Sequence, residues 1–444
     1  MYDELEFKNC DHSKDPILSC ALEGVASVAA GIKDASVVIH SPQGCAATVG
    51  AAYDAHEVDF TRRKIACTRL FETDVIMGAS EKLKSMIREA DKTFQTKVIF
   101  VIGTCAADII GEDMDGICKD VQPEVNAKLI PILAGGFRGN SNDGINLGMQ
   151  ALLPFIKTGD KIPNSVNIIA PQSNINPTWW ADLKWVKDTL QFLGIKVLSV
   201  LPYDISFSDL ENAGRASANI LLSSDAGYEF AYKMQENYKI PLILDEMPLP
   251  IGLNNTAKWL RSIGKYFDVE EKVELLIEKG EEKVADVLRK RALMIIPRYR
   301  NTRVAVSADA TIGISIIRML FEELEMIPEL ILIRSNQTSS KKMLNDELEK
   351  LKIHPKVAFG VDGYQIQESL ENSDIDVVIG SAWEKYMAEE IGIKAAFDVF
   401  SPTNRDVYVD RAYFGYDGML NMLEVFANDW ERAFRSKKIN FELY

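Results

Sequence analysis

The sequence predicts an α/β fold of three domains, each a mostly parallel sheet flanked by helices. Short β-branched runs alternate with amphipathic stretches along the whole chain, which is typical of parallel strands joined by crossover helices. The length of 444 residues predicts about three domains, and 47% apolar residues are enough for several packed cores.

The candidate strands form two series along the chain. The first series is 36–39, 97–102, 128–133, 166–170, 196–201, 218–222 and 241–244, and the second is 303–307, 329–333, 356–359, 376–379 and 394–397. Between them, apolar residues recur at helical spacing, for example at 80–92, 179–193 and 312–324. Each strand with its following helix is one unit of a wound sheet.

Two segments suggest domain boundaries. Residues 158–164 (TGDKIPN) are polar and contain Gly and Pro, and residues 264–300 form a charged helical segment. We therefore expect an N-terminal domain at 1–160, a central domain at 161–300 and a C-terminal domain at 301–444.

Composition excludes several classes of function. A net charge of −15 argues against nucleic-acid binding, which needs basic surface. No apolar run approaches the ~18 residues of a membrane span, so we expect no membrane partner. The few cysteines and the absence of a signal-peptide pattern predict a cytoplasmic protein with reduced thiols.

Three cysteines are the most informative residues. Cys45, Cys67 and Cys105 each stand where a strand or an apolar run gives way to a turn. Their spacings of 22 and 38 residues are too wide for a zinc ribbon or a ferredoxin-type run, so the ligands must converge through the fold. We expect these thiols to be ligands of an iron–sulfur cluster.

The sequence around two of these thiols suits a metal ligand. Cys105 follows a predicted parallel strand and opens a helix, whose amides favour a thiolate. Cys45 ends HSPQGC, where Pro42 and Gly44 are expected to form a tight turn with little side-chain bulk beside the sulfur.

The other cysteines and His40 are less certain from the sequence. Cys20 is either a fourth ligand or a buried thiol beneath the site, and both interpretations stay open. His40 is expected to be structural, with ligation as the minority interpretation. Cys10 and Cys118 have no comparable context and are expected to be structural.

Other catalytic motifs are missing from the sequence. There is no GxGxxG, GxxxxGK[ST], GxSxG or HExxH pattern, so ATP must act on another protein and we predict no catalytic residue in this chain. No cysteine follows Cys118 and no histidine follows His354, so the later domains cannot hold a cofactor with a thiolate and an imidazole.

The cysteine motifs carry a family resemblance. HSPQGC (40–45), IACTRLFETDVIMGA (65–79) and IGTCAADIIGEDMDG (102–116) resemble the nitrogenase molybdenum–iron protein family, and so do AGGFRGN (134–140), MPLPIGLNNTAKWL (247–260) and FGYDGMLNMLEVFAND (414–429). The resemblance spans nearly the whole chain and implies three Rossmann-like domains.

Within that family the chain looks most like a beta-type subunit of a nitrogenase-like reductase. The resemblance then implies that Cys45, Cys67 and Cys105 hold half of a P-cluster-like 8Fe–7S cluster at the interface with an alpha-type subunit. Alpha-type and scaffold subunits instead use a cysteine where Cys20 stands, together with the matches of Cys45 and Cys105. A 4Fe–4S cluster is therefore the alternative.

The expected function is electron relay in an ATP-dependent oxidoreductase. The resemblance implies a homologous alpha-type partner in an α2β2 heterotetramer and an ATP-hydrolysing iron protein that supplies electrons. The substrate is dinitrogen or another small molecule such as a methylthio-alkane. A cofactor-maturation scaffold with an interface 4Fe–4S cluster is the main alternative, and a tetrapyrrole reductase subunit is a third.

Overall fold

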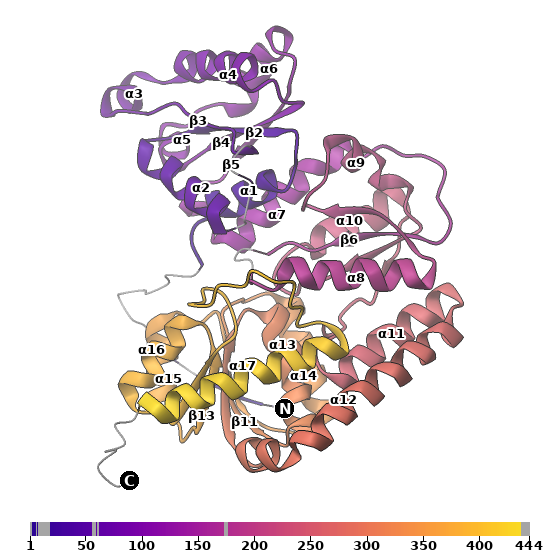
Figure 1. Ribbon diagram of the computed structural model, residues 1–444. Helices are drawn as coiled ribbons and strands as arrows, with labels where there is room; N and C mark the ends of the chain where they lie inside the picture. The colour runs from indigo at the N-terminus through magenta and orange to yellow at the C-terminus, as the bar shows by residue number, and fades with distance from the viewer. Residues whose placement is uncertain are drawn as a thin grey trace. The chain divides into compact units, whose positions relative to one another are not determined.

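The computed structural model describes residues 2–5, 7, 18–55, 59, 62–172 and 176–436, except for the side chains at 52, 55 and 432–436 (Figure 1). Cys10, which the sequence predicts to be structural, lies outside the described residues.

The described strands form three sheets, and all paired strands are parallel. The first has the order β3-β2-β4-β5, the second β7-β6-β8-β9 and the third β1-β12-β11-β10-β13-β14. This confirms the predicted α/β class with parallel sheets flanked by helices. Such strands are buried on both faces, which explains continuous apolar runs such as VIFVIG in β4.

Two compact units divide the chain. The N-terminal unit comprises the described parts of Leu18–Ile175 and Lys196–Asp245, and the C-terminal unit comprises those of Met1–Ile17, Asn176–Ile195 and Glu246–Tyr444. The first two sheets lie in the N-terminal unit and share one apolar core. The domain boundaries expected near 160 and 300 stay predictions.

The N-terminal unit carries eight strands and nine α-helices among its described residues. Its strands are β2 (Ala35–His40), β3 (Ile65–Cys67), β4 (Val98–Gly103), β5 (Lys128–Leu133), β6 (Ser165–Ile169), β7 (Lys196–Leu201), β8 (Ala218–Leu221) and β9 (Leu242–Ile243). Its helices are α1 (Ala21–Ala30), α2 (Gln43–Ala55), α3 (Glu72–Met77), α4 (Ser80–Phe94), α5 (Cys105–Ile110), α6 (Met114–Val121), α7 (Ser141–Leu152), α9 (Phe207–Asn212) and α10 (Tyr228–Tyr238), with short turns η2 (Gln122–Glu124), η3 (Gly136–Arg138), η4 (Leu153–Phe155) and η5 (Ala213–Arg215).

The C-terminal unit carries the six-stranded sheet. Its strands are β1 (Asp3–Glu4), β10 (Arg303–Ala308), β11 (Ile327–Ile333), β12 (Lys356–Phe359), β13 (Val377–Gly380) and β14 (Ala395–Asp398). Its helices are α8 (Trp179–Leu193), α11 (Leu253–Phe267), α12 (Glu270–Tyr299), α13 (Ala310–Arg318), α14 (Thr338–Leu351), α15 (Gly363–Glu371), α16 (Ala382–Ile391) and α17 (Gly415–Ser436), with a π-turn η6 (Met319–Glu323).

Packing within the C-terminal unit explains the glycine at the start of the GYDG segment (415–418). Gly415 has φ +76°, and a Cβ on it would lie 2.3 Å from Nε1 of Trp185 on α8. On the same helix, the buried Asp182 carboxylate accepts hydrogen bonds from the amides of Tyr413 (2.6 Å) and Phe414 (2.9 Å). This glycine is therefore required by local geometry.

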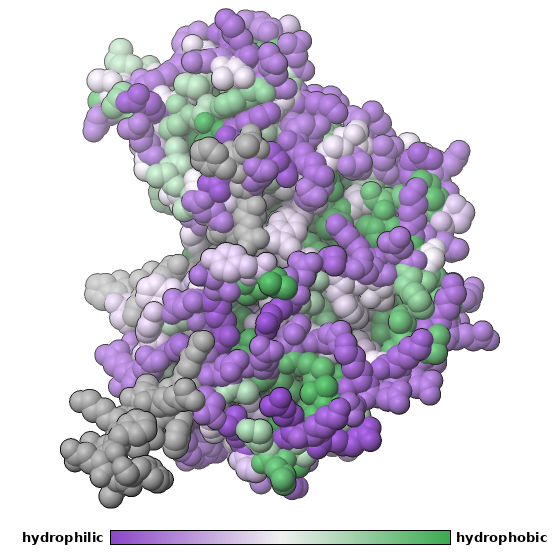
Figure 2. Space-filling view, in the orientation of Figure 1, coloured by the Kyte–Doolittle hydropathy of each residue, from purple (hydrophilic) through white to green (hydrophobic). Residues whose placement is uncertain are grey.

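Hydrophilic side chains cover most of the face drawn in Figure 2, with scattered apolar patches between them. Among the described residues, no helix combines the length and the apolar character that a membrane span requires.

Candidate functional site

The candidate site lies at the carboxyl edge of the first sheet, in the N-terminal unit. The neighbouring strands β2, β3, β4 and β5 end at His40, Cys67, Gly103 and Leu133, and the register pairs His40 with Gly103 and Gly103 with Leu133. Because the strands are parallel and end together, the segments that follow them meet at one edge.

Cys105 is the best-defined thiol of this edge. It is the first residue of α5, directly after the N-cap Thr104, as the sequence predicts. Its Sγ accepts a 2.9 Å hydrogen bond from the backbone amide of Gly136, in the segment that follows β5. This hydrogen bond ties the start of α5 to the segment after β5.

Cys20 is brought to the same place by two closely packed helices. A Cβ on Gly24 of α1 would lie 1.9 Å from the carbonyl oxygen of Ser141, and a Cβ on Gly144 of α7 would lie 2.0 Å from that of Ala21. Only glycines permit this approach of α1 to α7. It places Cys20, the N-cap of α1, in an antiparallel bridge with Asn140, the N-cap of α7.

Gly136 contacts both of these cysteines. A Cβ on Gly136 would lie 3.5 Å from Sγ of Cys105 and 3.7 Å from Cβ of Cys20. The missing side chain leaves room between the two thiols.

Cys45 lies in the first turn of α2, which begins at Gln43. The tight turn expected at Pro42 and Gly44 was therefore wrong for Gly44, because the helix starts before it. The expected lack of bulk is confirmed, since a Cβ on Gly44 would meet nothing within 4 Å.

The pKa of the Cys45 thiol depends on the other thiols of the site. Burial raises the pKa of the Cys45 thiol, and Cys105 and then Cys20 raise it further through repulsion between thiolates. The effect of Cys67 on this pKa is the smallest of the three. Cys105 and Cys20 thus influence the charge of Cys45 more than Cys67 does.

Cys67 makes its hydrogen bonds to Ser41 and Arg69. It is the last residue of β3, and its Sγ donates to the carbonyl oxygen of Ser41 at 3.4 Å and lies 3.6 Å from the Ser41 hydroxyl. The amide of Arg69 donates to the same sulfur at 3.4 Å. These contacts tie Cys67 to Ser41, which directly follows β2.

The donor set fits an iron–sulfur cluster better than a single metal ion. Within the described residues, no three His, Cys, Asp or Glu side chains converge closely enough to hold one ion. The ligands of a multi-iron cluster are spread more widely, and they are thiolates. All four cysteines are partly exposed, and Gly44 and Gly136 leave space beside three of them.

His40 and Cys118 have structural surroundings. His40 is fully buried, its Nδ1 lies 3.1 Å from the Thr68 hydroxyl, and its Nε2 lies 3.4 Å from the Glu112 carboxylate. Cys118 is buried in a separate apolar core, where burial raises the pKa of its thiol to about 12.

Exposed apolar side chains lie on the segments that carry the thiols. Phe71 precedes α3, Ile76 and Met77 belong to it, Ile109 belongs to α5, and Phe137 follows Gly136. Their exposed fractions run from 55% to 84%. Several large apolar residues exposed together mark an interaction surface.

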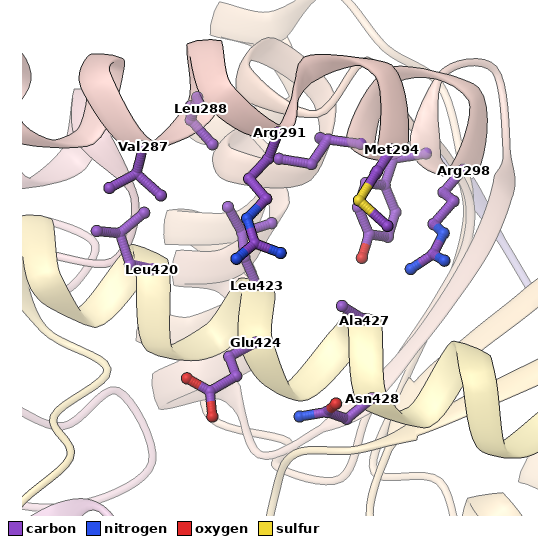
Figure 3. A pocket seen from close by; sticks show the side chains of 12 residues that line it. Val287, Leu288, Arg291, Met294, Arg298, Leu420, Leu423, Glu424, Ala427 and Asn428 are labelled. Atoms are coloured by element: carbon purple, nitrogen blue, oxygen red, sulfur yellow. The ribbon is translucent and has the colours of Figure 1, made fainter.

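Two other places in the described part of the chain offer polar side chains or a groove. Ser223 and Ser224 are buried just beyond the end of β8, and they offer hydroxyls but no thiol. A groove of about 390 Å³ lies between α12 and α17 and is lined by residues that include Arg291, Met294 and Leu423 (Figure 3). Neither place contains a metal-ligating cysteine or histidine.

Sequence reasoning missed the roles of Gly136 and Asn140. The amide of Gly136 binds Cys105, and Asn140 positions the start of α7 next to Cys20. Both belong to AGGFRGN, and this glycine-rich segment directly after a predicted strand was the available signal.

Known proteins similar to this chain extend over nearly its full length. NifE, the nitrogenase iron-molybdenum cofactor biosynthesis protein of Nostoc sp., is 27% identical over 94% of this chain and 85% of its own length. The nitrogenase molybdenum-iron protein alpha chain of Methanococcus maripaludis is 26% identical over 91% of this chain and 84% of its own. The nitrogenase vanadium-iron protein beta chain of Trichormus variabilis is 26% identical over 93% of both.

The fold agrees with a solved structure. A chain of nitrogenase Cp1 at pH 6.5 superposes with a TM-score of 0.83 over 99% of this chain and 97% of that one, at 18% identity. The family model for nitrogenase component 1 type oxidoreductases matches residues 20–431. The chain thus belongs to the nitrogenase component 1 type oxidoreductase family.

Proposed function

We propose that this chain is the electron-relaying subunit of a nitrogenase-like reductase, and that it holds an iron–sulfur cluster with Cys20, Cys45 and Cys105. The observation that carries the proposal is that Cys20 and Cys105 meet at Gly136, while both raise the pKa of the Cys45 thiol. This set differs from Cys45, Cys67 and Cys105, and it is supported by the contact of Gly136 with both Cys20 and Cys105 and by the larger effect of Cys20 than of Cys67 on the pKa of Cys45. Cys67 keeps its hydrogen bonds to Ser41.

The protein's own residues have distinct tasks in this proposal. Cys20 is the N-cap of α1, and Cys45 and Cys105 lie in the first turns of α2 and α5, so all three thiols stand at helix starts. The Gly136 amide adds a hydrogen bond to Cys105, which tunes its donor strength. When bound, the cluster supplies reversible one-electron transfer.

A partner subunit is needed to complete such a site. Three thiolates leave at least one iron of a cubane without a protein ligand from this chain. Phe71, Ile76, Met77, Ile109 and Phe137 offer an apolar surface that a homologous alpha-type subunit would cover. Covering them would also exclude water from the thiols.

The catalytic cofactor is assigned to that partner. This chain has no cysteine after Cys118 and no histidine after His354. We infer that an ATP-hydrolysing iron protein delivers electrons to the cluster and that the partner reduces the substrate, which is dinitrogen or another small molecule such as a methylthio-alkane.

A maturation scaffold is the second candidate. It is favoured by the similarity to NifE proteins, which are named for iron-molybdenum cofactor biosynthesis. It is also favoured by the close grouping of Cys20 with Cys45 and Cys105, the set that the resemblance implies for scaffold subunits. The ligand set therefore supports both candidates, and turnover separates them.

The test is an anaerobic assay of the complex with its homologous partner. The complex would be mixed with the iron protein, ATP and dithionite, and ATP-dependent dithionite oxidation would be followed. The relay proposal predicts sustained oxidation over many turnovers, lost in Cys105→Ala and kept in Cys118→Ala. An iron-containing complex that consumes no more than a few electrons per molecule would reject the relay and favour the scaffold.

A further inference from the structure

An ion pair between Asp108 and Arg138 joins the segment after β5 to the helix α5. Arg138 donates from Nη2 to Oδ1 of Asp108 at 2.8 Å and from Nε to Oδ2 at 3.5 Å. Asp108 lies on α5, three residues after Cys105, and Arg138 is the last residue of the turn η3, which begins at Gly136. The ion pair therefore connects the helix that begins with a thiol to the turn that binds this thiol.

The backbone before η3 lies directly against the start of α5. A Cβ on Gly135 would lie 2.6 Å from Oδ2 of Asp108 and 2.9 Å from the backbone nitrogen of Cys105, so a larger residue would displace one of them. The next residue, Gly136, donates its amide to Sγ of Cys105 at 2.9 Å. The thiol hydrogen bond and the ion pair thus come from the first and the last residue of the same short turn.

The chain that follows η3 also fixes the position of Cys20. The carbonyl oxygen of Gly139 accepts a 3.0 Å hydrogen bond from the amide of Ala21, and the amide of Ser141 donates to the carbonyl oxygen of Ser19 at 3.0 Å. Ser19 and Ala21 are the two neighbours of Cys20 in the sequence. The segment after β5 therefore positions both thiols, and the ion pair fixes this segment to α5.

We propose that Asp108 and Arg138 are positioning residues, which together hold the Gly136 amide on the sulfur of its cysteine. This role rests on the proposed iron–sulfur site. A hydrogen bond from an amide to a ligand sulfur stabilises the reduced cluster, because reduction adds negative charge to the cluster and its sulfurs. Breaking the ion pair should therefore make the reduction potential of the cluster more negative.

The ion pair is suited to setting geometry rather than global stability. The side chain of Arg138 is 45% exposed and that of Asp108 is 14% exposed, and ion pairs near the surface contribute little to the free energy of unfolding. A planar guanidinium that meets a carboxylate through two nitrogens fixes direction as well as distance. Loss of the pair should leave the melting temperature nearly unchanged while it changes the thiol site.

A direct effect of charge on the cluster makes a different prediction from positioning. If the two side chains acted only through their charges, removing the cation would make the reduction potential more negative and removing the anion would make it more positive. Positioning predicts a more negative potential in both cases, because both changes release the same turn. Asp108→Asn, which removes the charge and keeps the size of the side chain, therefore distinguishes the two.

A redox titration of the anaerobic complex with its partner subunit tests the positioning role. The oxidised-state paramagnetic spectrum would be followed in wild type, Arg138→Gln, Asp108→Asn and the double variant. At the wild-type midpoint, the ratio of reduced to oxidised cluster should fall by at least about threefold in each single variant. The double variant should shift no further, because the same contact is lost in all three. Arg138→Lys, which keeps the charge and can donate to the carboxylate, should restore part of the shift.

Alkylation of the metal-free chain gives a readout that does not depend on the cluster. Once η3 is released, the sulfur of Cys105 is less covered, so iodoacetamide should label it several-fold faster in both single variants. Cys67 should keep its rate, because its sulfur contacts Ser41 and the amide of Arg69 instead. A wild-type complex without iron would reject the proposed cluster, whereas an unchanged labelling rate of Cys105 would reject the positioning role.

Arg88→Gln is the matched control. Arg88 donates to the Glu124 carboxylate through two nitrogens, at 2.7 and 2.9 Å, and its side chain is 41% exposed. This pair joins α4 to η2, and neither element carries a thiol. The reduction potential and the labelling of Cys105 should stay at their wild-type values. A more positive potential in Asp108→Asn, or equal shifts in Arg88→Gln and Arg138→Gln, would overturn the positioning role.

Discussion

The backbone amide of Gly136 donates a 2.9 Å hydrogen bond to Sγ of Cys105, although 31 residues separate them in the sequence. The bond joins the segment after β5 to the first residue of α5. It shows that the glycine-rich segment after β5 is part of the thiol site.

Gly136→Ala should prevent cluster binding without unfolding the protein. The new Cβ would make ordinary contacts of 3.5 and 3.7 Å with Cys105 and Cys20, so the protein itself tolerates it, but it would fill the space between the thiols. We expect iron content to fall by more than half, with little change in melting temperature. Iron analysis of the anaerobic complex, with a thermal melt, measures both.

Gly50→Ala is the control for that change. Gly50 lies inside α2, where an added Cβ would meet nothing within 4 Å. Alanine should stabilise the helix by about 1 kcal/mol and leave iron content unchanged. Equal iron in both variants would contradict the proposed space beside Gly136.

Cys118 should behave as a structural residue. Burial raises the pKa of its thiol to about 12, so it is almost entirely protonated at pH 8. We expect Cys118 to resist alkylation in the native metal-free protein, while the partly exposed Cys20, Cys45, Cys67 and Cys105 react. Mass spectrometry of peptides after timed iodoacetamide treatment checks this, and rapid labelling of Cys118 would contradict it.

Cys118→Ala should cost about 1 kcal/mol of stability and no iron. Chemical denaturation and iron analysis of the same preparation measure the two effects. Iron loss comparable to that of Cys105→Ala would show that the distinction between ligand and structural cysteines is wrong.

Asp182→Asn should change how stability depends on pH. Burial raises the pKa of Asp182 from 3.8 to about 7, against the opposing effect of hydrogen bonds from Phe414, Tyr413 and Thr178. The folded state therefore holds a proton that the unfolded state releases above pH 4. The stabilisation that this bound proton provides is fully present below pH 3.8. It is lost as the pH rises through about 7.

Asparagine is neutral at every pH and keeps the acceptor oxygen for the two amides. The free energy of unfolding of the variant, relative to wild type, should therefore increase by about 4 kcal/mol between pH 4 and pH 8. Urea denaturation across this range measures it. Asp188→Asn, at an exposed carboxylate on the same helix, should show no such trend.

The sequence predicted the fold well because buried parallel strands have a strong pattern. β5, β7 and β12 coincide with the predicted ranges, and α8 does so among the helices. β3 was missed as a strand because it has only three residues, and β1 because it has two. Elements this short carry no periodicity, and pairing with neighbouring strands decides their structure.

The site was predictable only in part. The positions of Cys45, Cys67 and Cys105 after strands or apolar runs led to the expectation that they converge through the fold. The place of Cys20 depends on the close packing of α1 and α7 at Gly24 and Gly144, which no local pattern reveals. For this reason the sequence could not choose between Cys20 and Cys67.

The most direct test of the central claim compares Cys20→Ala with Cys67→Ala in the anaerobically purified complex with the partner subunit. Iron per complex, visible thiolate–iron absorption and the oxidised-state paramagnetic spectrum would be recorded for both and for wild type. The account predicts that Cys20→Ala loses most of the iron and changes the spectrum, while Cys67→Ala keeps both. Loss of the cluster in Cys67→Ala with retention in Cys20→Ala would contradict it and restore the ligand set of Cys45, Cys67 and Cys105.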